Sequence, residues 1–356
     1  MKLDDLHYTT RNIDGYNKPF NFIISAREAG KSTYITLKKV YEQFKKDKST
    51  FIYLKRLNVD ITDMYIDSLL GIIDKFYPED NCKFRYKKGD LNCGMIEVDI
   101  SINNSEYEPF IWCIALGVKL QRVKSLMLPR IKYIIFDEFI VNNLLGEKYL
   151  FNETFKFKEL FKTFQRENRQ LKCYFLGNPY SKYNPYFTEF NIPLSKIKRG
   201  TIISNDKAVV ENYELKPELL EYIKEHDPLY NYEDPYIKYA YEGESVNDQN
   251  IYLVDKQPEN YQLNTIFKVQ NTYINIFCGN NSDYNYWVSV TKNSIVGKRR
   301  NVYCINFSDL DGQCSYLYNI KGFDMWQSLR LALMSRQVAF KDLEAYYMME
   351  AIYPKL

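Results

Sequence analysis

The sequence is poor in histidine and has no regular cysteine pattern. Only two histidines occur in 356 residues, His7 and His226. This scarcity argues against histidine catalysis and against histidine-rich metal sites. The seven cysteines are irregularly spaced, without a CxxC pair, at positions 82, 93, 113, 173, 278, 304 and 314. An odd count with this spacing argues against a disulfide framework or a zinc site and favours buried, reduced thiols.

Long apolar runs and a signal segment are also missing. No apolar run approaches the ~20 residues that a membrane-spanning helix needs. The first five residues, MKLDD, place charges where a signal peptide would carry its apolar segment. We therefore expect a soluble, cytoplasmic protein. The formal net charge of +3 does not by itself indicate a nucleic-acid-binding protein. It does not exclude one whose contact surface is a local basic pore or stripe.

Short apolar runs alternate with helical patterns over the first 210 residues or so. The runs are Phe20–Ser25, Phe51–Leu54, Ile111–Leu116, Tyr133–Phe136 and Cys173–Leu176. The helical stretches are Lys31–Lys46, Asp60–Phe76 and Glu153–Arg166. Buried apolar runs that alternate with helices predict an α/β fold with a mainly parallel sheet. Residues 83–101, with Gly89-Asp90 inside them, predict an inserted β-hairpin.

The second part of the chain has a different texture. Glu214–Glu225 is a charged amphipathic helix, and the Asp-Pro pairs at 227–228 and 234–235 are turn signals, which suggest a linker or small helical subdomain over 211–247. Beyond residue 248 we expect a separate α+β unit. Its predicted strands are Tyr273–Cys278, Tyr284–Val290 and Val302–Phe307, its predicted hairpin turn is Gly279-Asn280-Asn281, and its predicted helices are Trp326–Arg336 and Lys341–Ile352. The predicted domains are 1–210, 211–247 and 248–356.

Residues 25–33 match a phosphate-binding loop, or P-loop. They fit the pattern GxxxxGK[ST] except at the first position, where Ser25 replaces glycine. A predicted strand leads in and a predicted helix leads out, so backbone N–H groups and the helix end can surround phosphates. Lys31 would reach the β- and γ-phosphates, and the Ser32 hydroxyl would bind Mg²⁺. The predicted nucleotide-binding residues are Ser25, Ala26, Arg27, Glu28, Ala29, Gly30, Lys31, Ser32 and Thr33. A strand–turn–helix corner with an incidental lysine is the alternative.

Two acids end a second apolar strand. Residues 132–138 read KYIIFDE, which is the Walker B pattern. Asp137 is positioned to hold Mg²⁺, and Glu138 to orient or deprotonate the attacking water. In isolation such a pair is also common as a solvated strand end. The two motifs together, in this order, predict an ATPase that uses ATP and Mg²⁺.

Polar residues around a third strand are candidates for sensing or triggering hydrolysis. Asn178 follows Cys173–Leu176, where a polar side chain beside the Walker B strand can contact the γ-phosphate or the water. Its alternative is an Asn-Pro turn. Arg166 and Arg169 are candidate arginine fingers from a neighbouring subunit, which accelerate hydrolysis by about 10³–10⁵-fold. A solvated helix end explains both arginines equally well.

With these residues placed, the whole sequence resembles the DNA-packaging ATPases, or encapsidation proteins, of small protein-primed tailed phages. The resemblance covers nearly the full length. Two matching strings are not generic ATPase features, Phe51–Arg56 and Asn184–Phe187. The other matching strings are Asn21–Ile24 with Ser25–Arg27, Lys124-Ser125 and Ile135–Ile140.

The resemblance implies a P-loop ATPase of the ASCE, FtsK/HerA-like type. It implies a homo-oligomeric ring, a pentamer, on the portal vertex of an empty procapsid, where double-stranded DNA is the substrate. A packaging RNA is a further potential partner. The implied place is the host cytoplasm at the portal vertex, with no membrane and no presence in the mature virion.

The resemblance also assigns individual residues. Arg166 matches the family's trans-acting arginine and joins Lys31 and Glu138 as a catalytic residue. Lys124 matches a lysine that acts across the subunit interface at the nucleotide, and Lys55-Arg56 match a basic pair after the second strand. Residues 165–168 are less basic than in the family, so Arg169 stays a competitor for Arg166.

The family's C-terminal domain resembles the RNase H-like nuclease of large terminases but has lost cleavage. The residues agree, because a two-metal nuclease needs acids on adjacent strands. The predicted strands 273–278 and 302–307 carry none, and Asp309 and Asp311 follow the strand. Lys298-Arg299-Arg300 is a basic loop that either touches phosphates or forms a solvated turn.

The sequence thus predicts a ring motor that moves viral DNA by gripping its phosphates rather than its base edges. Candidate pore segments are Arg85–Lys88 and Lys196–Arg199. One alternative is a large terminase with an active C-terminal nuclease. Another is a nucleotide-gated assembly protein with little turnover, against which Glu138 argues.

Overall fold

A computed structural model describes residues 7–88, 95–117, 128, 130–142, 147–150, 152–181, 184–193, 196–228, 252–281, 283–295, 302–317, 324–335 and 337–352. The chain divides into two compact units, one of Met1–Tyr180 with Ser195–Val246 and one of Ser181–Leu194 with Asn247–Leu356. The predicted boundary at 247 lies one residue from this division, whereas no boundary falls at 210 and Ser181–Leu194 groups with the second unit. No helix among the described residues is long and apolar enough to cross a membrane.

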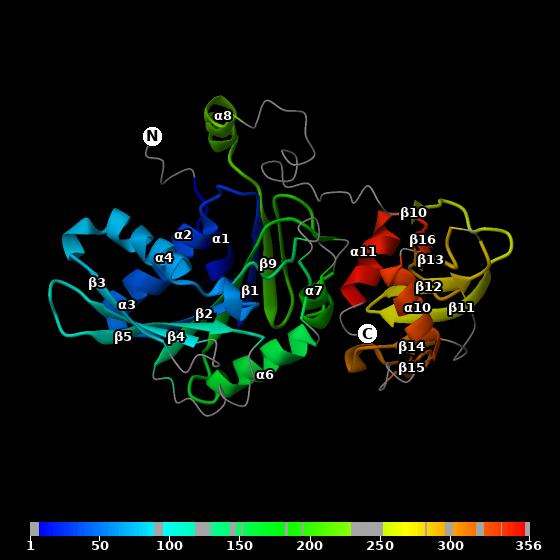
Figure 1. Ribbon diagram of the computed structural model, residues 1–356, viewed down its shortest axis with the longest axis horizontal. Coiled ribbons are helices and arrows are strands. Elements are labelled where there is room, and N and C mark those ends of the chain that lie inside the picture. The colour runs from blue at the N-terminus through cyan, green and yellow to red at the C-terminus, as the bar shows by residue number, and fades with distance from the viewer. Residues whose placement is uncertain are drawn as a thin grey trace. The chain divides into compact units, whose positions relative to one another are not determined.

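A nine-stranded sheet forms the centre of the first unit's described part (Figure 1). Its order is β3-β4-β5-β2-β6-β7-β1-β9-β8. The strands are β1 (Phe20–Ser25), β2 (Thr50–Lys55), β3 (Lys83–Lys88), β4 (Met95–Ser101), β5 (Glu108–Ala115), β6 (Ile131–Asp137), β7 (Lys172–Gly177), β8 (Thr201–Ser204) and β9 (Ala208–Tyr213). The six strands from β5 to β9 in this order pair in parallel, whereas β3, β4 and β8 are antiparallel to their neighbours. The predicted parallel α/β sheet and its inserted hairpin are confirmed; the Gly89-Asp90 turn lies outside the described residues.

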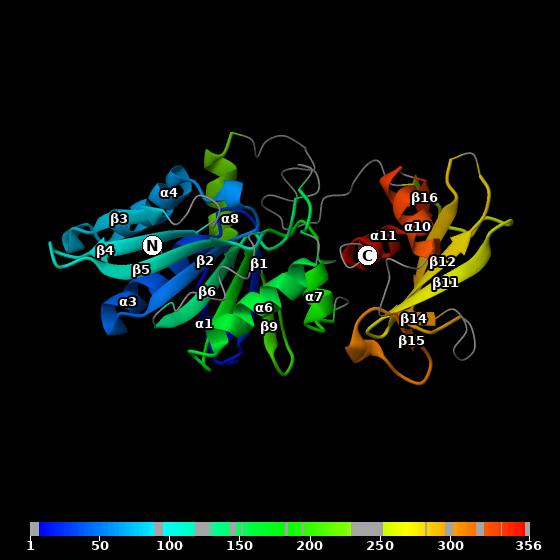
Figure 2. The same cartoon turned by 60° about the horizontal axis from the view of Figure 1, so that its bottom comes forward.

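Helices cover both faces of this sheet (Figures 1 and 2). The first unit's helices are α1 (Arg11–Asp14), α2 (Lys31–Tyr34), α3 (Glu42–Asp47), α4 (Asp63–Phe76), α6 (Glu153–Gln165) and α8 (Pro217–His226), with the π-helix η2 (Ile35–Tyr41) and the 3-10 helices η3 (Asn58–Asp60) and η4 (Pro78–Asp80). Alternate residues of a strand point to opposite faces. Accordingly Ile135 packs with α4 and η2, whereas Phe136 stacks against Phe157 of α6.

The predicted helix Lys31–Lys46 is continuous but changes its winding. It consists of α2, the π-helical segment η2 and α3. Periodicity alone does not distinguish these windings, because the apolar side chains of η2 still face one core. That core side holds Ile35, Leu37, Val40 and Tyr41, all buried.

The second unit contains a seven-stranded sheet in its described part, with the order β10-β16-β13-β12-β11-β14-β15. Its elements are β10 (Tyr252–Leu253), β11 (Gln262–Val269), β12 (Thr272–Cys278), β13 (Tyr286–Thr291), β14 (Val302–Cys304), η7 (Phe307–Asp309), β15 (Ser315–Tyr316), α10 (Asp324–Met334), β16 (Val338–Phe340) and α11 (Leu343–Ile352), together with α7 (Pro185–Glu189). The strands β11, β12 and β13 are antiparallel, while β14 and β15 follow β11 in parallel. This α+β order is that of an RNase H-like sheet, as the fold class predicted.

Several described elements of the second unit differ from the prediction: the short strands β10, β15 and β16 were not predicted, and two larger differences concern β14 and β11. The predicted strand 302–307 ends at Cys304, because Asn306 starts a 3-10 turn in which its Nδ2 donates to Asp309 Oδ2 at 3.1 Å. Strand β11, which lies between β12 and β14, was not predicted at all. Its alternation of polar and apolar residues is weak, since Thr265 lies buried and Lys268 is half-buried.

Candidate nucleotide site

Three parallel strands bring the predicted site residues to one edge of the sheet. The order β6–β7–β1 places one strand between the P-loop strand and the Walker B strand. Asp137 pairs in register with Leu176, and Ile24 pairs with Gly177. The carboxyl ends of these strands therefore lie side by side, which is where open α/β sheets bind ligands.

The P-loop uses left-handed backbone at two positions. Glu28 has φ +61° and Gly30 has φ +78°. A Cβ on Gly30 would lie 2.9 Å from Cδ2 of His7, so this glycine is needed for both its conformation and its close approach. Ser25 is fully buried and its φ is not positive, so the first position of the motif does not require glycine in this chain.

Lys31 points across the loop to the third strand. Its Nζ donates to Oδ1 of Asn178 at 2.8 Å. Burial lowers the pKa of Lys31 to about 8, against the opposing influence of the Asp137 and Glu138 charges. The P-loop lysine and the predicted sensor asparagine therefore meet at one point.

Lys55, at the end of β2, lies against both Walker B acids. Its Nζ is 3.0 Å from Oδ2 of Asp137 and 3.0 Å from Oε2 of Glu138. Burial opposes the charge of Lys55, but the two carboxylates outweigh it and raise the pKa above its ordinary value. The Glu138 side chain is 67% exposed and its backbone is left-handed, with φ +61°. A cation thus already occupies the space between the two acids.

Arg56 braces the turn after the Walker B strand. Its Nε donates to Oε2 of the fully buried Glu153 at 2.9 Å, and its guanidinium donates to the backbone oxygens of Glu138 and Phe139 at 3.1 and 2.9 Å. A buried pair with this many additional hydrogen bonds holds its geometry well. The resemblance identified Lys55-Arg56 as a basic pair. It did not predict that Lys55 contacts the Walker B acids while Arg56 holds the turn that follows them.

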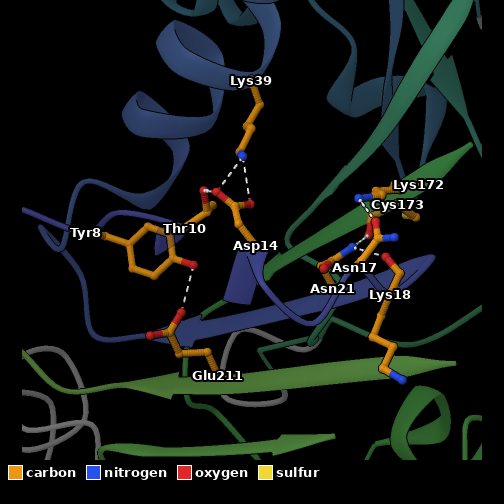
Figure 3. A network of polar contacts seen from close by, with 10 residues as sticks. All are labelled: Tyr8, Thr10, Asp14, Asn17, Lys18, Asn21, Lys39, Lys172, Cys173 and Glu211. Atoms are coloured by element: carbon orange, nitrogen blue, oxygen red, sulfur yellow. Dashed lines mark hydrogen bonds and ion pairs between the residues drawn. The ribbon is translucent and has the colours of Figure 1, made fainter. Parts of the chain in front are cut away.

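The N-terminal segment contacts the P-loop and is also tied to β9 and η2; Figure 3 draws the contacts to β9 and η2. The Tyr8 backbone N–H donates to the Ala29 oxygen at 2.7 Å, and the Tyr8 hydroxyl donates to Oε2 of Glu211 on β9 at 2.9 Å. Asp14 pairs with Lys39 at 2.7 Å, which ties α1 to η2. Sequence reasoning missed this support, because a tyrosine and a glutamate 203 residues apart give no local pattern.

Helix α8 packs against the P-loop as well. Its buried Leu219 and Ile223 form one apolar cluster with Ala26 and Ala29. Residues 211–213 belong to β9, and α8 belongs to the first unit, so the described part of the predicted linker is attached to the nucleotide loop.

The two candidate arginines lie at the opposite edge of the sheet. Arg166 and Arg169 are exposed and follow α6, just before β7 begins. Asn168 between them donates to the backbone oxygen of Ile131, the first residue of β6, at 2.9 Å. Thirteen helical residues, about 20 Å, separate this end of α6 from Glu153 beside the site. Neither arginine can reach the phosphate edge of its own subunit.

Other predicted residues lie elsewhere. Lys124 and Lys298-Arg299-Arg300 fall outside the described residues. In Arg85–Lys88, the Arg85 and Lys87 side chains pair with Asp99 at 2.6 and 2.8 Å. Near Lys196–Arg199, Arg199 pairs with Glu214 at 3.0 Å.

The two units differ in the described side chains that could bind a metal ion. Among the described residues, no group of three or more His, Cys, Asp and Glu side chains is arranged to hold a metal ion. The Lys268 ammonium of β11 pairs with the Asp311 carboxylate instead. In the first unit, the hard oxygens of Ser32 and Asp137 fit magnesium, which proteins hold through one or two carboxylates and the substrate's phosphates.

Comparison with known proteins gives a consistent result. The model of the family described as "Podovirus DNA encapsidation protein (Gp16)" matches residues 3–355. The "DNA packaging protein" of Bacillus phage phi29 is 27% identical over 208 residues, which cover 58% of this chain and 56% of that protein. That of Bacillus phage B103 is 31% identical over 177 residues, 50% of this chain and 49% of that protein. The matched region thus spans about half the length of these relatives.

Two solved structures share the fold over nearly the whole chain. "The bacteriophage Phi-29 viral genome packaging motor assembly" has a TM-score of 0.56 and 20% identity, and covers 98% of this chain and 99% of that chain. "The Phi-28 gp11 DNA packaging Motor" has a TM-score of 0.58 and 16% identity, and covers 98% and 97%. These similarities confirm the fold of both units.

Proposed function

Because the chain belongs to the podovirus DNA encapsidation protein family, we propose that it is an ATPase that drives double-stranded viral DNA into an empty procapsid. The observation that carries this proposal is the convergence of Lys31, Asn178, Asp137 and Glu138 at the carboxyl edge of one parallel sheet. Such an edge, with a glycine–lysine turn and two acids, is built for a triphosphate. The relatives named for DNA packaging support the choice of substrate.

The residue roles follow from this geometry. Residues 25–33 wrap the phosphates with their backbone N–H groups, and Lys31 bridges the β- and γ-phosphates. Asn178, whose Oδ1 accepts a hydrogen bond from Lys31, contacts the γ-phosphate. Glu138 orients the attacking water and accepts its proton at a carboxylate oxygen.

Magnesium would be held by the Ser32 hydroxyl and the Asp137 carboxylate, and when bound it neutralises charge on the phosphate oxygens. Lys55 pairs with both Asp137 and Glu138. Only Oε2 of Glu138 takes part in this contact, and the Glu138 side chain is 67% exposed, so water can reach it. Lys55 therefore orients the two acids from one side.

The site is completed by a neighbouring copy. Arg166 is exposed and lies at the far end of α6 from its own phosphate edge. As an arginine finger it would therefore act in trans, which agrees with a ring, a pentamer in our proposal. Lys124 is proposed to act across the same interface. The further proposed partners are the procapsid portal and a packaging RNA, and the proposed place is the portal vertex in the host cytoplasm.

The central test separates binding from hydrolysis. Lys31→Ala should abolish ATP hydrolysis and weaken binding, whereas Glu138→Gln should retain ATP and fail to split it. Lys207→Ala, an exposed lysine on the β8–β9 turn, is the matched control and should leave both unchanged. Wild-type hydrolysis rates in both site variants would reject the ATPase proposal.

The trans arginine has its own test. Arg166→Ala subunits keep an intact phosphate edge, and Lys31→Ala subunits keep the arginine. Mixing the two should restore part of the hydrolysis that each lacks alone. No recovery, with Arg166→Ala alone fully active, would move the role to Arg169.

A further inference from the structure

An apolar surface lies exposed beside the candidate nucleotide site. Leu57, Val59 and Met64 are 42%, 75% and 81% exposed. The segment begins two residues after Lys55, whose Nζ contacts both Walker B acids. Clustered exposed apolar side chains on a soluble domain mark an interaction site. Residues 57–67 are called the docking segment below.

The charge of the docking segment narrows the choice of partner. It carries Asp60, Asp63 and Asp67 and no lysine or arginine. Lys88 of β3 pairs with Asp63 at 2.7 Å and the Tyr86 hydroxyl donates to Asp67, so Asp60 and Asp67 are the two acids of the segment without an ion pair among the described residues. Carboxylates repel the phosphates of DNA, RNA and anionic lipid, so none of these fits the surface. A protein surface that combines cations with some apolar area fits it.

Such a surface exists on the same chain. Lys162, Arg166 and Arg169 are exposed where α6 ends, and none of them forms an ion pair with another described residue. Residues 162–169 are called the basic end below. It carries three cations against the single acid Glu167.

The docking segment and the basic end cannot meet within one copy. The docking segment follows the carboxyl end of β2, whereas Asn168 in the basic end contacts the amino end of β6. The docking segment runs into α4 and the basic end lies at the end of α6. These two helices cover opposite faces of the sheet (Figures 1 and 2). Two complementary surfaces on opposite sides of one molecule generate head-to-tail contacts, which close into a ring when the rotation permits.

Resting on the proposed function, we propose that the docking segment of one copy binds the basic end of the next copy. Val59 and Met64 supply the apolar burial, and Asp60 and Asp67 select and orient the cations, because Asp63 already pairs with Lys88. The contact brings Arg166 to the side of the neighbour on which the phosphate edge lies. The same contact between neighbouring copies then forms the interface and also completes the nucleotide site with Arg166.

Self-association of the full chain tests the apolar part. Sedimentation velocity over a concentration series should show association at least about tenfold weaker for Val59→Asp and Met64→Asp than for wild type. Leu331→Asp, on an apolar side chain of α10 that is 66% exposed, is the matched control and should associate normally. Unchanged association of both docking variants, equal weakening by the control, or a wild-type chain that stays monomeric throughout would overturn the proposal.

Charge reversal tests the pairing without assuming a register. One variant carries Asp60→Lys with Asp67→Lys, which spares the Asp63–Lys88 pair, and another carries Lys162→Glu with Arg169→Glu, so that Arg166 is left intact. Each variant alone should associate poorly, and an equimolar mixture should recover association between unlike copies. No recovery in the mixture would overturn the pairing of these two surfaces.

Failure of this interface and failure of the proposed function give different results. The association assay contains no nucleotide and can be repeated on Lys31→Ala. If the wild-type chain did not hydrolyse ATP but the docking variants still lost association, the ATPase proposal would fail and the interface would stand. If the wild-type chain hydrolysed ATP and the docking variants associated normally, the interface would fail and the ATPase proposal would stand.

Discussion

At the residue scale, Lys31 is poised to lose its proton near neutral pH. Burial lowers its pKa to about 8, and only the protonated form attracts phosphate. ATP affinity should therefore fall as the pH rises through this value, by about tenfold between pH 7 and pH 9. Fluorescence titration with a nucleotide analogue over this range measures it. Lys31→Arg, whose charge does not titrate, should give a flat profile; an equally steep one would contradict the assignment.

Gly177 is the second residue with a sharp prediction. A Cβ at this position would lie 2.7 Å from Cε1 of the buried Phe139, in the turn after the Walker B strand. Gly177→Ala should therefore destabilise the chain by about 1–3 kcal/mol, measured by denaturant unfolding. Gly71→Ala, on the exposed side of α4 with open space around it, is the control and should stabilise by up to about 1 kcal/mol. The reverse order of stabilities would contradict the packing.

The motif residues could be predicted from the sequence, whereas the side chains of the same chain that contact them could not. Lys31 and Asp137 are readable because phosphate and magnesium chemistry fixes their type and spacing. The contacts of Lys55 and Arg56 depend on β2 lying next to β6 in the sheet, which no local pattern gives. The roles of the motif residues remain predictions until the substitutions above are measured.

At the element scale, strand β9 carries a buried acid beside the P-loop strand. Glu211 is buried, and its carboxylate accepts hydrogen bonds from Tyr8 and Asn12. Burial raises its pKa above the ordinary value, although the two hydrogen bonds oppose the shift. The folded chain therefore holds this proton at a pH where the unfolded chain has lost it. Stability from this group is full below the ordinary carboxyl pKa and is lost as the pH rises through the raised value.

Glu211→Gln should remove that loss. The amide oxygen can still accept from Tyr8, so unfolding at neutral pH should need more denaturant than in wild type, while at pH 4 the two chains should differ little. Glu221→Gln, an exposed acid on α8, should show no such pH-dependent gain. A variant that is less stable than wild type at both pH values would show that Glu211 is favourable as a charge.

The sequence predicted those elements whose pattern is local. The buried parallel strands stand out as continuous apolar runs, and β1 has the bounds that its run predicted. The β8–β9 hairpin and β11 were missed. Both contain buried polar residues, such as Glu211 and Thr265. These residues interrupt the apolar run by which a buried strand is predicted.

At the scale of the whole molecule, the second unit has an RNase H-like strand order, and its described residues contain no group of acids arranged to hold a metal ion. Lys268 stands on β11, between β12 and β14, and pairs with the Asp311 carboxylate. The full chain should therefore leave supercoiled plasmid intact with Mg²⁺ or Mn²⁺, as followed by gel electrophoresis. Nicking that disappears in Asp309→Asn with Asp311→Asn would establish an active nuclease and favour the terminase alternative.

The division of the chain into units lay beyond sequence reasoning. Ser181–Leu194 groups with elements found more than 60 residues later, as in the bond from Gln270 to the Ile192 oxygen, with |i−j| of 78. Composition changes gradually there and gives no signal for this return. Boundaries drawn from composition place α7 in the first predicted domain, whereas its contacts group it with the second unit.

This threading has a mechanical consequence. Only Pro179 and Tyr180 separate Asn178, which holds Lys31, from Ser181, the first residue of the second unit. Three peptide steps span at most about 11 Å, so the two cannot drift apart independently. A displacement of Asn178 is therefore passed along the covalent backbone to Ser181 within three residues.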